Sequence, residues 1–304
     1  MQFLYFLEDI RVPILNEFML LVTQLGEETA FLAVALVLFW CVDKYKGYFI
    51  LSVGFIGTLS NQFMKLWFRI PRPWLVDPHF TILEQAMEAA SGYSFPSGHT
   101  QSAVGTFGGI AATSKNRWVR FLAITAAVLV PISRMYIGVH TPLDIFVSVA
   151  VALLLIAVLR PIILENGKKA LPVIFLMMIV LGVGFLCFVE LYPFPSDIDI
   201  HNLESGCKNA YTLLGSLSGL IIVYIIDEKW LHFPTKGVWW AQVLKVAGGL
   251  AVVLAVKSGL KLPLNLLFGE SLGRSVRYGM IVIVAGILWP LTFKFFNRLG
   301  TGEK

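Results

Sequence analysis

The sequence predicts an all-α protein, a polytopic transmembrane helical bundle. Of its 304 residues, 57% are apolar and only 14% are charged. The mean hydropathy of +0.76 is well above that of water-soluble domains. Several apolar runs approach the roughly 20 residues that a helix needs to cross the hydrocarbon core of a bilayer. Lipid is therefore the predicted surrounding of most of the chain.

The elements follow one another as apolar runs separated by polar connections. Residues 3–25 carry apolar side chains at helical spacing with Glu8, Asp9 and Arg11 between them, which favours a helix lying at the membrane interface. Transmembrane spans are then predicted at about 28–43, 47–66, 99–114, 119–136, 143–164, 171–190, 208–226, 238–256 and 277–296. A stretch near 191–207, rich in proline and aspartate, interrupts the apolar pattern. It predicts a first domain of residues 1–191 and a C-terminal extension of residues 192–304.

The basic residues predict the orientation of these spans, because short cytoplasmic loops carry an excess of lysine and arginine. Alternate connections hold basic clusters, at Lys44, Lys115, Lys168, Lys229 and Lys294. We expect these connections and the C-terminus in the cytoplasm, and the connection 67–98 and the acidic stretch 190–204 outside it. The formal net charge of +5 is spread over short clusters, so it indicates membrane orientation and does not favour nucleic-acid binding.

The cysteines predict neither a disulfide framework nor a zinc site. Cys41, Cys187 and Cys207 are odd in number, and their spacing is not that of metal ligands. No metal and no other cofactor is predicted.

Three segments place polar residues at helix ends on one predicted face, the extracytoplasmic one. Residues 65–73 contain Lys65 and Arg72, and residues 96–99 read Pro-Ser-Gly-His. The third segment, residues 133–144, closes one span and opens the next. Polar residues at such positions are costly in a membrane protein and favour a function.

The last two segments indicate an anion-binding helix end and a histidine nucleophile. Ser97 can cap the helix that follows it, and the free N–H groups of a helix N-terminus favour an anion. Pro142 suits the first turn of a helix and places Asp144 about one turn beyond His140. The carboxylate would then select one imidazole tautomer and leave the other ring nitrogen as a nucleophile. A nucleophile, an acid and surrounding cations are what cleavage of a phosphate ester requires.

The three segments resemble the motifs of the type 2 phosphatidic acid phosphatase (PAP2) superfamily, which also includes vanadium haloperoxidases and glucose-6-phosphatase. These motifs are lysine-x6-arginine-proline, proline-serine-glycine-histidine and serine-arginine-x5-histidine-x3-aspartate, and the resemblance covers about residues 45–165. It implies a six-helix catalytic core, and the apolar runs after residue 191, which the resemblance does not cover, predict about three further transmembrane helices.

The resemblance also implies a role for each motif residue. The phosphate would be held by Lys65, Arg72 and Arg134, with Ser97 and the amide of Gly98 assisting. His140 would be the nucleophile and Asp144 would orient it. His99 would protonate the leaving group and later activate water.

The predicted function is metal-independent hydrolysis of a lipid phosphate monoester or diphosphate through a phosphohistidine intermediate. Phosphatidic acid, phosphatidylglycerophosphate and a polyprenyl diphosphate are the substrates that this chemistry fits. The alternatives are a phosphatase of a water-soluble ester such as a sugar phosphate, and a non-enzymatic lipid-binding or transport protein. Haloperoxidation is disfavoured, because those relatives are typically soluble and their vanadate pocket faces water.

Two features stay open at the level of sequence. The helices after residue 191 could shape a lipid entrance, form the contact of a homo-oligomer or be a separate module. Four cations lie on the predicted outer side, where the orientation rule expects few. Either they reach the interface around a re-entrant or short helix, or they bind an anionic headgroup or a second phosphate. They are Lys257, Lys261, Arg274 and Arg277.

Overall fold

The computed structural model describes residues 1–87, 90 and 92–298, and these residues form helices and loops without a strand. The predicted all-α class is therefore confirmed. The α-helices are α1 Gln2–Asp9, α2 Pro13–Gln24, α3 Glu28–Val37, α4 Lys44–Phe68, α5 Pro73–Val76, α6 Gly98–Ala103, α7 Gly109–Thr113, α8 Arg117–Tyr136, α9 Pro142–Leu191, α10 Ile200–Ile226, α11 Trp239–Gly259, α12 Lys261–Ile283 and α13 Phe293–Arg298. Shorter π and 3₁₀ segments are η1 Leu38–Val42, η2 Glu84–Ala86, η3 Val104–Gly108, η4 Asp227–Leu231, η5 Val284–Leu288 and η6 Pro290–Thr292.

The chain packs as two compact units that alternate along the sequence. Unit 1 contains residues 1–32, 49–162 and 195–205, and unit 2 contains residues 33–48, 163–194 and 206–304. These units are defined by contacts between residues, whereas the predicted division between residues 191 and 192 was based on composition. That predicted division stays a prediction.

The N-terminal segment differs from the single helix expected over residues 3–25. It forms two helices, because Pro13 begins α2 and keeps the preceding residue, Val12, extended at φ −133° and ψ 151°. Met19 of α2 is buried in one cluster with Tyr136 and Val139, so α2 packs on the unit 1 core. Its predicted location at the membrane interface stays a prediction.

Within the described part of the chain, five helical stretches are long and apolar enough to cross a membrane: α8, α9, Ile200–Leu231, α11 and Lys261–Phe296. The stretches Pro13–Gln24 and Glu28–Val42, bent by 53°, would together make a sixth. The predicted span 47–66 falls in α4, which is 25 residues long but carries buried polar side chains such as Ser52 and Asn61. The predicted total of nine spans therefore stays a prediction.

The two spans predicted at 143–164 and 171–190 lie in one helical stretch, α9, of 50 residues. At the 1.5 Å rise of an α-helix, such a stretch is roughly twice as long as one crossing requires. Its backbone leaves the helical region at Asn166, with φ −130° and ψ 28°, in the predicted connection between the spans.

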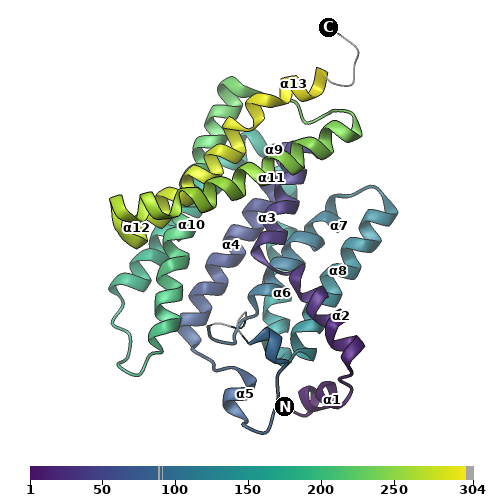
Figure 1. Cartoon of the computed structure of the whole chain (residues 1–304), viewed down its shortest axis with the longest axis vertical. Helices are drawn as coiled ribbons and strands as arrows, with labels where there is room; N and C mark the ends of the chain where they lie inside the picture. Colours follow the sequence, from purple (N-terminus) through teal and green to yellow (C-terminus); the bar gives the residue numbers. More distant parts are fainter. Residues whose placement is uncertain (88–89, 91, 299–304) are drawn as a thin grey trace. The chain divides into compact units, whose positions relative to one another are not determined.

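In unit 1, α8 packs against α2, α6 and α7, and Figure 1 shows α6, α7 and α8 beside one another. Val130 of α8, Val22 of α2 and Ala103 of α6 form a buried cluster at this junction. The turn after α8 has Gly138 at φ +94°, a conformation that residues with a side chain rarely adopt. A Cβ there would also lie only 3.0 Å from the carbonyl oxygen of Thr81. This turn leads directly to the predicted site.

In unit 2, α11 packs along α12 (Figure 1). Residues 33–48 join this unit through polar bonds as well as apolar packing. Lys44 Nζ lies 2.7 Å from Oδ1 of the buried Asp227, and Trp40 Nε1 donates to the carbonyl oxygen of Ala285 at 2.9 Å. These bonds provide partners for the buried carboxylate of Asp227 and the buried indole of Trp40.

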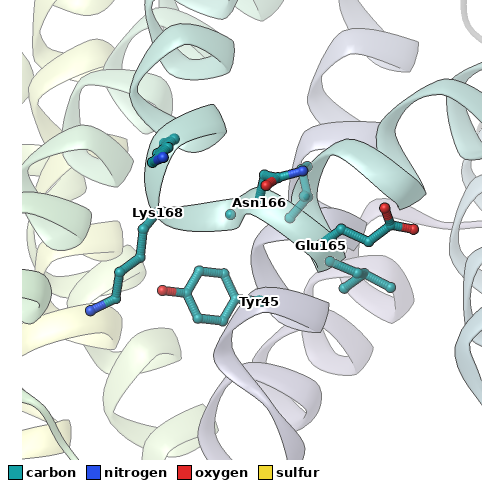
Figure 2. Close-up of a pocket in the computed structure, with 8 residues that line it drawn as sticks. Tyr45, Glu165, Asn166 and Lys168 are labelled. Carbon is teal, nitrogen blue, oxygen red and sulfur yellow. The ribbon is translucent and has the colours of Figure 1, made fainter.

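A cavity of about 320 Å³ lies at the break of α9 in unit 2. Figure 2 shows the hydroxyl of Tyr45 facing Lys168, while the carboxylate of Glu165 points to the other side of Asn166. Its lining contains none of the eight predicted site residues; it consists of Tyr45 and residues 163–169. The cavity is therefore separate from the predicted chemistry.

The four cations of the predicted outer side have different environments in unit 2. Lys257 and Lys261 are exposed, and Arg274 Nη2 lies 3.6 Å from Oε1 of Glu270. Arg277 is buried, and its guanidinium lies over the ring of its neighbour Tyr278. Both interpretations of these residues stay predictions.

Candidate active site

Two cations of the first motif are held by a single loop of unit 1. Lys65, in the last turn of α4, donates through Nζ to the carbonyl oxygen of Tyr93. Arg72, just before α5, donates through Nε to the carbonyl oxygen of Gly92 at 3.0 Å. The loop that leads into the second motif therefore brings both cations to one place.

The second motif opens a helix as the sequence predicts. Ser97 is the N-cap of α6, and its hydroxyl accepts a hydrogen bond from the backbone N–H of Thr100 at 3.3 Å. Asn61 of α4 donates through Nδ2 to the carbonyl oxygen of Pro96 at 3.3 Å, which ties the loop to α4. Gly98 and the partly exposed His99 form the first turn of α6.

Arg134 lies in the last turn of α8 and is only 1% exposed. Its Nη1 donates to the hydroxyl of Thr23 in α2 at 2.7 Å. Its backbone carbonyl accepts from the N–H of Val139 at 3.1 Å, which closes the turn toward His140. Its Nε is buried and has no hydrogen-bond partner among the described residues.

His140 and Asp144 are each 1% exposed and lie beside Arg72. Nη1 of Arg72 is 3.0 Å from Nε2 of His140 and also donates to the carbonyl oxygen of Val139 at 2.9 Å. A guanidinium has donors and no acceptor, so in this contact Nε2 is the acceptor and carries a lone pair. The proton of a neutral ring then belongs on Nδ1, which lies 3.4 Å from Oδ2 of Asp144.

The side chain of Asp144 also helps to cap the N-terminus of α9. The backbone N–H of Thr141 donates to Oδ2 of Asp144 at 2.7 Å, and the N–H of Asp144 donates to the hydroxyl of Thr141 at 3.3 Å. This reciprocal pair is a capping box with aspartate in the place of the usual glutamate, and Pro142 occupies the first position of α9. The capping box holds the carboxylate of Asp144 at the start of α9, where it faces the ring of His140.

The charges around His140 are mostly positive. Burial lowers the pKa of the His140 imidazole well below its usual range, and nearby Arg72, Arg134 and Lys65 lower it further. Burial also lowers the pKa of Arg72 to about 10, an effect that Asp144 opposes. The site therefore combines a neutral imidazole with a cluster of cations that favours an anion.

The structure joins most of the predicted residues by contacts within unit 1. Arg72 contacts His140 at hydrogen-bond distance, and Nδ1 of His140 lies 3.4 Å from Oδ2 of Asp144 without forming a hydrogen bond among the described residues. The N–H of Ser97 donates to the backbone carbonyl of Asp144 at 3.3 Å, which brings the second and third motifs together. Among the described residues, no hydrogen bond joins the His99 ring to the other predicted residues. Such a set of groups can bind a tetrahedral oxyanion and present a ring nitrogen to its central atom.

Comparison with known proteins identifies the family. Residues 45–168 match the PAP2 superfamily, and residues 211–302 match the transmembrane extension of PAP2 superfamily phosphatases. Over 159 residues the chain is 31% identical to phosphatidylglycerophosphatase B of Bacillus subtilis (strain 168). The matched region is 48% of this chain and 74% of that protein. This chain belongs to the PAP2 superfamily. It is a phosphatase and an integral membrane protein, and the resemblance inferred from its three motifs is confirmed.

Two other PAP2 relatives are undecaprenyl-diphosphatases. The enzyme BcrC of Bacillus subtilis (strain 168) is 30% identical over 102 residues, which is 34% of this chain and 50% of that protein. The enzyme of Sulfolobus acidocaldarius is 29% identical over 137 residues, or 44% of this chain and 64% of that protein. No solved structure matches the chain.

Three residues of this PAP2 site were not singled out from the sequence: Thr23, Asn61 and Ser94. Thr23 contacts Arg134 from 111 positions away, and Ser94 contacts Asp144 from 50 positions away. Hydrogen bonds between such distant residues leave no periodic pattern. Ser94 alone had a usable signal, since it is a small polar residue just before a motif that has to turn sharply.

We expect His140 of this phosphatase to stay neutral at pH values where an ordinary histidine is charged. Its pKa is lowered, so its protonation should occur below the usual value near 6.5, and the lone pair should persist through pH 6. The ¹⁵N resonances of the five histidines followed against pH would measure this, with His140→Ala identifying the relevant signal. Titration of that signal at or above pH 6.5 would contradict the prediction.

Proposed function

We propose that this chain hydrolyses the phosphate monoester or diphosphate of a membrane lipid through a phosphohistidine on His140. The observation that carries the proposal is the contact of Arg72 Nη1 with His140 Nε2 at 3.0 Å, because it implies a lone pair on Nε2 beside a cation. Three relatives named phosphatidylglycerophosphatase or undecaprenyl-diphosphatase support a lipid as substrate.

The first step transfers the phosphoryl group to the protein. The Nη1 of Arg72 moves its hydrogen bond from Nε2 of His140 to a phosphate oxygen, which frees the lone pair. Nε2 then attacks phosphorus, the P–N bond forms, and the P–O bond to the lipid breaks. The leaving oxygen takes a proton from His99. Lys65, Arg72 and Arg134 bind the equatorial oxygens, and Arg134 Nε, buried without a hydrogen-bond partner in the described chain, gains one from the phosphate.

The second step releases the phosphate. His99, now neutral, takes a proton from water, the water oxygen attacks phosphorus, and the P–N bond breaks to restore the lone pair of His140. Asp144 keeps the Nδ1 proton in place during both steps. The proton that His99 takes from water is the one that it gives to the leaving oxygen of the next lipid.

A lipid substrate and an outward-facing site belong together in this proposal. A phosphate at the mouth of a helical bundle can keep its acyl or polyprenyl tail among the spans. The distribution of lysine and arginine between the connections supports an extracytoplasmic active site and a cytoplasmic C-terminus.

Phosphate release from a panel of substrates tests the proposal. The purified protein, in chelator, is given phosphatidic acid, phosphatidylglycerophosphate, undecaprenyl diphosphate, sphingosine phosphate and glucose phosphate. We expect release from at least one lipid, and none above background from the same lipid with the His140→Ala protein. Release from glucose phosphate alone would overturn the lipid assignment, and inhibition by the chelator would overturn the metal-independent mechanism.

A further inference from the structure

Ser94 makes a short contact with the carboxylate of the proposed site. Its side chain is fully buried, at 0% exposure, and its hydroxyl donates to Oδ2 of Asp144 at 2.6 Å. Its backbone N–H donates to the carbonyl oxygen of Ile70 at 2.8 Å, within the first motif. Ser94 therefore lies where the segment of Arg72 and the start of α9 meet.

Three polar groups of the described residues lie around the same carboxylate oxygen. Oδ2 of Asp144 accepts from Ser94 and from the N–H of Thr141 at 2.7 Å, and it lies 3.4 Å from Nδ1 of His140. Short hydrogen bonds to an ionised carboxylate are strong, and two of them on one oxygen restrict its rotation. The position of the atom that faces the imidazole is thus set by Thr141 within α9 and by Ser94 from outside it.

The cap of α9 does not require Ser94. Thr141 and Asp144 already satisfy each other in the capping box, and Ser94 adds a second donor to an oxygen that the cap has engaged. Removing the Ser94 hydroxyl leaves that cap intact and also leaves the backbone bond to Ile70. The change would act on how firmly Asp144 is held against His140.

We propose that Ser94 is a positioning residue, which holds the Asp144 carboxylate at Nδ1 of His140 and so keeps Nε2 available for phosphoryl transfer. This inference rests on the proposed function. In metal sites, removing a partner that orients a ligating histidine typically changes activity roughly 10–100-fold, and we expect a similar range for this histidine. The cations that bind the phosphate are unaffected, so the loss falls on kcat and leaves KM within about threefold.

The variant Ser94→Ala tests this on the substrate that gives the highest rate in the panel. We expect kcat to fall roughly 10–100-fold, and Ser94→Thr, which keeps a hydroxyl, to recover part of the loss. Ser52→Ala is the matched control: Ser52 is also 0% exposed and lies in unit 1, but its hydroxyl has no partner among the described residues. An equal loss of kcat in Ser52→Ala would overturn the proposal.

The ¹⁵N spectrum of His140 gives a readout that a purely structural role would leave unchanged. The wild type should show a ring protonated on Nδ1, and Ser94→Ala should show a mixture of the two tautomers. Where Ser94→Ala does not fold, Ser94→Cys keeps the volume with a weaker donor and is expected to lose kcat as well. Wild-type kcat in a folded Ala or Cys variant would overturn the role of Ser94, whereas full activity of His140→Ala would overturn the proposed function itself.

Discussion

Replacing His140 with alanine is expected to lower phosphate release by roughly 10⁴-fold or more, the usual effect of removing a nucleophile. The alanine has no lone pair to attack phosphorus, and the cations around it can bind the substrate but cannot complete the transfer. The measurement is inorganic phosphate released per minute by purified protein in detergent. With ³²P-labelled substrate, the wild type should also yield an acid-labile phosphoprotein, which the variant should lack.

His79→Ala is the matched control for this variant. His79 lies in an exposed loop of the same unit and takes no part in the proposed chemistry, so its loss should leave phosphate release unchanged. Substantial activity in His140→Ala would exclude a phosphohistidine at this position. Equal losses in both variants would show that the effect does not depend on the position of His140.

Replacing Arg72 with lysine is expected to lower kcat roughly 10²–10³-fold, the range found when one donor to a developing oxyanion is removed. Lysine keeps the positive charge, but a single ammonium group cannot contact all the partners that the guanidinium of Arg72 contacts. Nε of Arg72 bonds to Gly92, and Nη1 contacts Val139 and His140. A lysine could take only part of this geometry, because its charge is a point at the end of a flexible chain.

The steady-state rate of the Arg72→Lys protein should be compared with that of Arg120→Lys. Arg120 is exposed at the start of α8, where Nη2 donates to the carbonyl oxygen of Ser114. We expect Arg120→Lys to match the wild type in kcat. An Arg72→Lys protein within threefold of the wild type would mean that charge alone is sufficient at this position.

The parts of the site that sequence could predict are those set by local rules. Ser97 was expected to cap a helix and does so, since capping is decided within four residues. Asp144 was expected one turn after His140, and the capping box with Thr141 places it there. The all-α class could be predicted from the apolar composition and the lengths of the apolar runs, which indicate helices surrounded by lipid.

The parts that sequence could not predict depend on packing between distant segments. Thr23 reaches Arg134 only because α2 packs on α8, and no pattern within α2 marks that threonine as special. The break of the N-terminal segment at Pro13 was readable in principle, since proline disfavours helix at the residue before it. The apolar periodicity on either side of Pro13 outweighed that signal.

The capping box at the start of α9 predicts which residues stay unchanged in variants that still fold. One carboxylate, that of Asp144, both begins the helix and faces His140. Thr141 is the N-cap and Asp144 is its partner at the third helical position, so loss of Asp144 weakens the cap and lowers folding stability, whatever the protein does. A population of variants screened only for expression in the membrane should therefore retain Asp144 while His140 drifts. The retention of an aspartate here would by itself report on folding, and only its retention together with the histidine would report on catalysis.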